Sequence, residues 1–201
     1  MIAIADYGMG NRRSVEKALA HVGAESVITA DVRDASAIIL PGVGAFPEAM
    51  RNLERSGLRE QLVERAAAGV PVLGICLGMQ LLFESSSEHE GAEGLGILPG
   101  VVTKLESPRL PHIGWNLVSF SRASALTEGL GEAAAFYHVH SFACRPADAS
   151  DVVGTGEYGE RFVSVVERDN VMAAQFHPEK SSTDGLQMLK NFAALAAALV
   201  A

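Results

Sequence analysis

Short apolar runs alternate with helical patterns through the first half of the chain, and this alternation restricts the fold more than any other feature. We expect strands at Ile2–Asp6, Ser26–Thr29, Ala37–Leu40 and Val70–Ile75. Apolar residues at helical spacing predict helices at Ser14–His21, at Pro47–Ala68 with a break at Gly57, and at Gly78–Glu84. This order predicts an α/β fold with a doubly wound, mostly parallel sheet flanked by helices.

The second half is richer in strand patterns than the first. Runs at Gly100–Leu105, His112–Phe120 and Phe136–Ala143 predict strands, and Phe162–Gln175 predicts a hairpin. A terminal helix is expected at Asp184–Val200, with Thr183 as its N-cap. We therefore expect antiparallel strands in this half, within a single domain that spans residues 1–201.

Composition and charge exclude several classes of protein. Hydrophobic residues make up 48% of the chain and charged residues 20%, which is typical of a globular protein. The net charge of −8 argues against a nucleic-acid partner. No apolar stretch approaches the ~20 residues of a membrane span, and the first residues do not form a signal peptide. Because Cys76 and Cys144 do not make a disulfide framework, we expect a cytoplasmic protein.

Cys76 lies in the segment G-I-C-L-G, where an apolar run meets a helical pattern. The segment has the form of a nucleophile elbow, in which a sharp strand-to-helix turn exposes the reactive side chain. Glycine at positions 74 and 78 lets neighbouring backbone approach closely. The Leu77 N–H would then face the oxyanion of an acyl-transfer reaction. The alternative is a structural cysteine at an ordinary turn.

His177 and Glu179 lie in the segment Q-F-H-P-E-K, directly after a predicted strand. A thiol nucleophile needs an imidazole base, and that base needs a partner that fixes its orientation. The spacing of two residues places both side chains on one side of an extended segment. The alternative is a surface loop, but together with the elbow these residues favour a Cys–His–Glu triad.

Three other features carry weaker signals. The turn P-G-V-G (Pro41–Gly44) follows a predicted strand, where its backbone could supply a second oxyanion donor. In H-V-H, the side chains of His138 and His140 share a strand face; we favour strand packing over a metal site, because no Cys or carboxylate cluster accompanies them. Residues 6–11 contain only part of a dinucleotide-binding fingerprint. Cys144 has no elbow around it, so we expect a structural thiol.

The elbow and H-P-E together resemble the class I (triad) glutamine amidotransferases. Further segments make the chain similar to the glutaminase subunits of imidazole glycerol phosphate synthases. These segments are Y-G-M-G-N-x-x-S (Tyr7–Ser14), L-P-G-V-G-A-F (Leu40–Phe46), P-H-I-G-W-N (Pro111–Asn116), H-V-H-S-F (His138–Phe142) and H-P-E-K-S (His177–Ser181). The resemblance covers nearly the whole chain. It departs from the family at Arg12, where leucine is more usual, and at Phe142, where tyrosine is common.

The resemblance implies a mechanism for L-glutamine hydrolysis without a cofactor or metal. Cys76 would attack the side-chain amide, His177 would protonate the departing ammonia, and Glu179 would hold His177. The oxyanion and glutamine-binding residues implied by the family are Gly42, Val43, Gly44, Leu77, Gln80, His140, Ser141 and Phe142.

The resemblance also implies a partner, a (β/α)8-barrel synthase subunit that receives the ammonia through a channel and forms a heterodimer with this chain. The partner would convert a phosphoribulosyl aminoimidazole carboxamide nucleotide to imidazole glycerol phosphate in histidine biosynthesis. Asn11, Trp115, Tyr137 and Lys180 would lie near the interface. Two alternatives are the glutaminase subunit of pyridoxal phosphate synthase and a catalytically silent partner-binding subunit.

Overall fold

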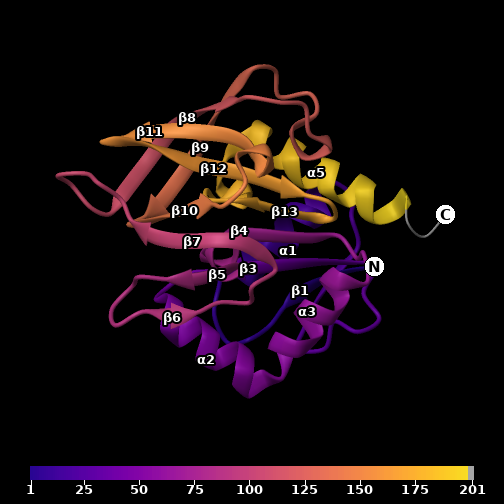
Figure 1. Ribbon diagram of the computed structural model, residues 1–201. Coiled ribbons are helices and arrows are strands. Elements are labelled where there is room, and N and C mark those ends of the chain that lie inside the picture. Colours follow the sequence, from indigo (N-terminus) through magenta and orange to yellow (C-terminus); the bar gives the residue numbers. More distant parts are fainter. Residues whose placement is uncertain (199–201) are drawn as a thin grey trace.

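A nine-stranded mixed sheet forms the centre of the computed structural model, which describes residues 1–198 (Figure 1). Five neighbouring strands are parallel; in sheet order they are β2 (Ser26–Thr29), β1 (Ile2–Ala5), β3 (Ala37–Gly42), β4 (Val72–Cys76) and β13 (Val171–Ala174). The sheet continues antiparallel through β12 (Glu160–Arg168), β11 (Val152–Tyr158), β8 (His112–Phe120) and β9 (Ala133–His140). The predicted α/β class with antiparallel strands in the second half is confirmed.

Helices cover both faces of the parallel part, as a doubly wound fold requires. On one face α1 (Arg12–His21) and α5 (Ser182–Ala198) pack against β1, β3 and β4. On the other face lie α2 (Phe46–Ser56) and α3 (Leu58–Ala67), separated by Gly57 as the sequence predicts. The strands are buried on both sides, which explains their continuous apolar runs.

A second, four-stranded sheet covers the same face as α2 and α3. Its strands, in sheet order, are β10 (Phe142–Pro146), β7 (Leu98–Lys104), β5 (Phe83–Ser86) and β6 (Ala92–Glu93). Three 3-10 turns complete the chain: η1 (Ala125–Thr127), η2 (Ala149–Asp151) and η3 (Pro178–Lys180). No helix within residues 1–198 has the length and apolar character that crossing a membrane would require.

Two of the predicted elements are wrong in extent. The helix expected at Gly78–Glu84 is the short α4 (Leu77–Leu81), and strand β5 begins two residues later. The reason is that the carbonyls of Leu81 and Leu82 accept hydrogen bonds from the 95–98 segment instead of from a further helical turn. The strand expected at Phe136–Ala143 is two strands, β9 and β10, which belong to different sheets.

The predictions differ from the structure at the C-terminus and in the second half as well. Helix α5 begins at Ser182, so Thr183 lies inside its first turn and is not the N-cap. The predicted end of this helix, residues 199–200, lies outside the described residues. Strands β5, β6 and β11 had no clear signal in the sequence; β11 carries two glycines in V-V-G-T-G-E-Y, which weaken a strand pattern.

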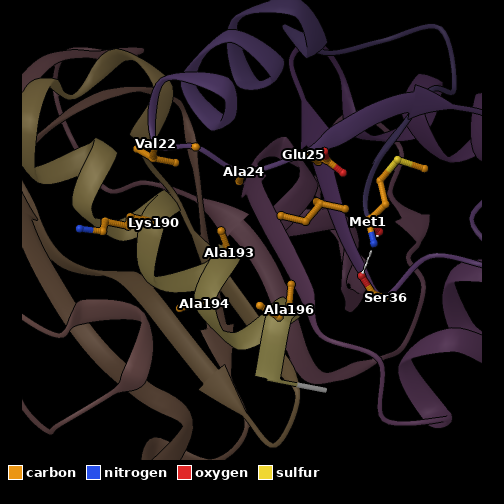
Figure 2. Close-up of a pocket in the computed structure, with 12 residues that line it drawn as sticks. Met1, Val22, Ala24, Glu25, Ser36, Lys190, Ala193, Ala194 and Ala196 are labelled. Carbon is orange, nitrogen blue, oxygen red and sulfur yellow. Dashed lines mark hydrogen bonds between the residues drawn. The ribbon is translucent and has the colours of Figure 1, made fainter. Parts of the chain in front are cut away.

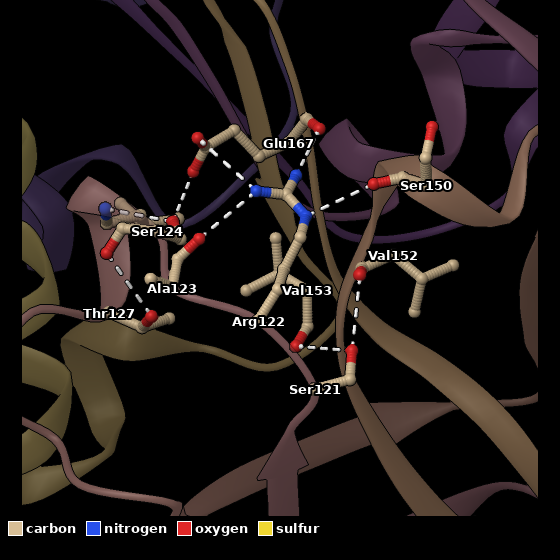
Figure 3. Close-up of polar contacts among 10 residues, drawn as sticks. Ser121, Arg122, Ala123, Ser124, Thr127, Ser150, Val152, Val153 and Glu167 are labelled. Carbon is tan, nitrogen blue, oxygen red and sulfur yellow. Dashed lines mark hydrogen bonds and ion pairs between the residues drawn. The ribbon is translucent and has the colours of Figure 1, made fainter.

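Arg122, which follows β8, joins the loop after this strand to the neighbouring η2 and β12 by hydrogen bonds (Figure 3). Its guanidinium donates to the backbone carbonyls of Ser150 at 3.1 Å, Ala123 at 3.2 Å and Glu167 at 2.7 Å. The Ser124 hydroxyl donates to the carboxylate of Glu167. These bonds tie β8, η2 and β12 together at the end of the sheet distant from Cys76.

Candidate functional site

The carboxyl ends of four parallel strands meet at one edge of the large sheet. The register pairs Gly42 of β3 with Cys76 of β4, and Ala174 of β13 with Ile75. The loop after β1 packs on the same edge, since the Tyr7 hydroxyl donates to the carbonyl of Pro41 at 2.7 Å. Ligands of open α/β sheets bind at such edges. The topology therefore brings the P-G-V-G turn, the G-I-C-L-G segment and the end of β13, which leads into H-P-E, to the same edge of the sheet.

Cys76 occupies the strained turn between β4 and α4. Its φ of +56° and ψ of −113° are unusual for a residue with a side chain. A Cβ at position 78 would lie 1.8 Å from the carbonyl oxygen of Leu40, and one at position 74 would lie 2.9 Å from the carbonyl oxygen of Gly78. Only glycine fits at both positions, which is the geometry of the predicted elbow.

His177 and Glu179 form a hydrogen-bonded pair across the turn at Pro178. The Nδ1 of His177 lies 2.9 Å from Oε1 of Glu179, and both side chains are buried. The turn is held from both sides: the His177 N–H donates to the Tyr137 carbonyl at 3.0 Å, and the Ser181 hydroxyl donates to the His177 carbonyl at 2.7 Å. The backbone thus fixes the imidazole before any ligand arrives.

The surroundings of His177 favour its protonated, positively charged form. Burial disfavours a protonated ring, but hydrogen bonds to Cys76 and Glu179 outweigh it and raise the pKa of His177 from 6.5 to about 10. An imidazolium at this position stabilises negative charge on the Cys76 sulfur and can deliver a proton to a leaving group. The other oxygen of Glu179, Oε2, is buried without a partner among the described residues.

A cavity of about 340 Å³ opens above Cys76 and His177. Ten of the residues singled out in the sequence line it: Val43, Gly44, Cys76, Leu77, Gln80, His140, Ser141, Phe142, His177 and Lys180. Two others lie behind its wall. Glu179 is behind His177, and Gly42 is so close to α4 that a Cβ would approach the Gly78 nitrogen to 2.6 Å. The size of the cavity suits a small polar metabolite.

A wider hollow of about 620 Å³ lies beside Met1 and Lys190 (Figure 2). The described residues that line it include several alanines of α5 and no cysteine or histidine. This hollow therefore lacks a candidate nucleophile and base such as Cys76 and His177 provide in the smaller cavity.

Four residues of the site were missed by the sequence reasoning. Glu88, Pro111 and Val139 line the cavity. Pro111 and Val139 lie in the quoted segments P-H-I-G-W-N and H-V-H-S-F without having been assigned to the site, and nothing in the sequence around Glu88 marks it. Gln175 is buried beneath the cavity, with its Nε2 3.9 Å from the Cys76 sulfur. Its Oε1 accepts from Nε2 of Gln80 at 3.1 Å, so it links the nucleophile to a cavity-lining side chain. Its place at the start of Q-F-H-P-E was the available signal.

The two histidines of H-V-H have different surroundings. His140 lines the cavity, whereas both ring nitrogens of His138 are engaged, by the Phe136 carbonyl at 3.0 Å and the Ser164 hydroxyl at 2.9 Å. Within residues 1–198, no group of His, Cys, Asp and Glu side chains is arranged to hold a metal ion. Cys144 is buried in the core below the second sheet.

The residues expected at a partner interface lie at the surface around the same edge. Trp115 is 56% exposed and meets Tyr137 edge to face, with ring centroids 6.3 Å apart. Its neighbours on the same face of β8, Ile113 and Leu117, are 59% and 58% exposed. Lys180 is exposed next to the triad turn. We call Ile113, Trp115 and Leu117 the β8 stripe.

Asn11 and Arg12 lie where α1 begins, after the loop that follows β1. Asn11 is the half-buried N-cap residue of α1, without a side-chain capping bond. Arg12, one of the departures from the family pattern, forms an ion pair with Asp6 at the end of β1. Arg12 therefore has a local ion-pair partner at this position.

Comparison with known proteins gives one consistent family. The model of the family described as "Glutamine amidotransferase class-I" matches residues 3–196. The chain is 50% identical over 198 residues to an imidazole glycerol phosphate synthase subunit HisH from Bacillus cereus (strain G9842), covering 96% of this chain and 93% of the relative. It is 51% identical over 194 residues to the subunit HisH from Aquifex aeolicus, covering 94% of each.

Solved structures agree on the fold. A crystal structure titled glutamine amidotransferase superposes with a TM-score of 0.77 at 20% identity, covering 98% of each chain. The structure of PurLQS from Thermotoga maritima superposes with a TM-score of 0.76 at 20% identity, covering 96% of this chain and 97% of the other.

The elbow predicts a sharp difference between two glycine-to-alanine changes. Gly78→Ala should lower the free energy of unfolding by more than ~3 kcal/mol, because its Cβ would collide with a backbone carbonyl. Gly96→Ala should cost roughly 1 kcal/mol, since this residue has a φ of +64° but open space around it. Urea unfolding of both variants measures the difference, and equal losses would refute the crowding.

The raised pKa of His177 predicts a pH dependence of stability. The protonated ring stabilises the native state fully below about pH 6.5, and this contribution disappears as the pH rises through about 10. The stability advantage of the wild type over His177→Gln should therefore decrease between those pH values. Urea unfolding of both proteins at pH 6, 8 and 10 tests this, because the titrations of groups not in contact with His177 cancel in the difference; a flat difference contradicts it.

Proposed function

Because the chain belongs to the class I glutamine amidotransferase family, and within it to the HisH subunits of imidazole glycerol phosphate synthase, we propose that its cavity hydrolyses L-glutamine with Cys76 as nucleophile. The chain is the glutaminase subunit of that synthase, an enzyme of histidine biosynthesis. Since the family model matches residues 3–196, we propose one glutamine amidotransferase domain.

The observation that carries the proposed mechanism is the buried Cys76–His177–Glu179 arrangement at the floor of the cavity. The Cys76 sulfur attacks the side-chain amide carbon of glutamine, and the carbonyl oxygen becomes an oxyanion. When the C–N bond breaks, the His177 imidazolium gives its proton to the leaving nitrogen, and ammonia departs. A γ-glutamyl thioester remains on Cys76.

The second half of the reaction uses the same groups in reverse. The neutral His177 takes a proton from water, and the hydroxide attacks the thioester carbon. The C–S bond breaks, glutamate leaves, and the sulfur again lies beside an imidazolium. Glu179 keeps the Nδ1 proton of His177 in place throughout, so the other ring nitrogen faces the reacting atoms. None of these steps requires a cofactor.

We assign the oxyanion donors to the backbone on both sides of Cys76. Leu77 is the first residue of α4, where N–H groups have no intrahelical acceptor. The other donor comes from the segment of Gly42, Val43 and Gly44; Gly44 has a φ of +107°, which a glycine adopts easily. Gln80, His140, Ser141 and Phe142 form the wall that holds the amino-acid end of glutamine.

A synthase subunit implies a partner subunit, and we propose that it is a (β/α)8 barrel. The β8 stripe supports a docking surface on this side, because large apolar side chains rarely stay in water as a contiguous group. Asn11, Trp115, Tyr137 and Lys180 would contact the barrel. Ammonia would pass through a channel, since it loses its nucleophilicity when water protonates it. Because both cysteines are free thiols, we propose a cytoplasmic location.

Replacement of Cys76 should separate the two activities of the complex. In the complex with its barrel partner, Cys76→Ala should reduce glutamine-dependent synthesis at least ~10³-fold, because no thioester can form. Synthesis from added ammonium salts should stay within about twofold of the wild type. Loss of both activities would make Cys76 structural. If the wild-type complex hydrolyses no glutamine, the chain is a silent partner-binding subunit.

Glu179→Gln should slow glutamine hydrolysis about 10²-fold or more, because an amide can hold the wrong tautomer of His177. The effect should fall on kcat, while ammonia-dependent synthesis is retained. The surface change Glu132→Gln is the control and should leave both activities unaltered. Unchanged hydrolysis in Glu179→Gln would remove Glu179 from the triad.

A further inference from the structure

A chain of buried hydrogen bonds runs from β8 into the wall of the cavity. His112 lies directly opposite His140 in the β8–β9 register, and both are at most 5% exposed. The Nδ1 of His112 is 3.0 Å from Nε2 of His140, whose Nδ1 is 2.8 Å from the Phe142 carbonyl oxygen. On the far side, Nδ2 of Asn116 is 3.2 Å from Nε2 of His112.

The direction of every hydrogen bond in this series is determined by its two ends. The Phe142 carbonyl can only accept, so Nδ1 of His140 carries the proton and Nε2 of the neutral ring carries none. His112 must therefore donate from Nδ1 and accept at Nε2, where the Asn116 amide donates. Both rings stay neutral, and burial agrees with this by lowering the pKa of His112 and, to about 4, that of His140.

The series of hydrogen bonds ends at the side-chain amide of Gln80. Besides His140, the Phe142 carbonyl accepts from Nε2 of Gln80 at 3.2 Å. The second proton of that Nε2 goes to Gln175 at 3.1 Å. Both amide protons are thereby used, and Oε1 of Gln80 is left to accept a hydrogen bond from a ligand in the cavity.

We propose that His112 is a positioning residue for glutamine binding, acting through His140 and the Phe142 carbonyl to keep the amide oxygen of Gln80 turned toward the substrate. This inference rests on the proposed glutaminase function. His112 itself does not line the cavity, whereas its neighbour Pro111 does, so a test of the proposal must separate the hydrogen-bond route through Gln80 from a shift of Pro111.

The packing around His112 prevents the ring from reorienting. Tyr158 stacks on one side with centroids 4.0 Å apart and planes at 19°, and His138 stacks with centroids 5.1 Å apart and planes at 20°. His138 is as deeply buried as His112, but its hydrogen bonds stay within β9 and β12 and do not reach the cavity.

Two amide substitutions at position 112 separate the roles of its two nitrogens. In His112→Asn the side-chain Nδ2 replaces the ring Nδ1 and can still donate to His140. In His112→Gln the amide reaches the Nε2 position toward Asn116 and leaves His140 without its donor. In the complex with the partner, His112→Gln should raise KM for glutamine about tenfold, and His112→Asn should stay within about twofold.

A double-mutant cycle tests whether the effect passes through Gln80. In a Gln80→Met background, His112→Gln should change KM less than twofold, since there is no amide to orient. His21→Gln, at the exposed last turn of α1, is the control and should leave KM within twofold of the wild type. Ammonia-dependent synthesis monitors folding and partner binding in every variant.

Two outcomes overturn the proposal: His112→Gln leaves KM within twofold of the wild type, or it raises KM by the same factor with and without Gln80. A wild-type complex that hydrolyses no glutamine would instead defeat the proposed function, so the two failures are distinguishable.

Discussion

The site depends on one crowded contact, the approach of α4 to the end of β3. Gly78 lies against the carbonyl of Leu40 with no room for a side chain, and Gly42 also lies too close to the first turn of α4 to carry one. This contact brings the turn of Cys76 next to the P-G-V-G segment. The proposed nucleophile and the proposed second oxyanion donor, which are distant in the sequence, are thereby held at fixed separation, as acyl-transfer catalysis requires.

The residues of the proposed triad could be singled out in the sequence because its chemistry requires particular residues at short spacings. Cys76 has glycines on both sides, and His177 and Glu179 lie two residues apart. The parallel strands were equally readable, because burial on both faces leaves continuous apolar runs. Gln175 and His112 lie in the quoted segments Q-F-H-P-E-K and P-H-I-G-W-N, but no local spacing reveals their contacts, which are with residues far along the chain, Cys76 and His140.

One error of prediction falls on the site itself. The sequence from Phe136 to Ala143 reads as a single strand, yet the structure divides it at Ser141 between two sheets. The division is tertiary in origin, since the Ser141 carbonyl pairs with the Leu105 N–H at the end of β7. It turns the Phe142 carbonyl toward Gln80 and His140. A continuous strand would have no carbonyl at that point for both side chains.

The β8 stripe has a consequence for the life of the isolated chain. Ile113, Trp115 and Leu117 are exposed to water in the isolated chain, and β8 lies next to the edge strand of the large sheet. Surfaces of this kind favour self-association and precipitation. With the proposed partner docked on this face, any subunit made in excess of that partner would keep the β8 stripe uncovered and prone to association.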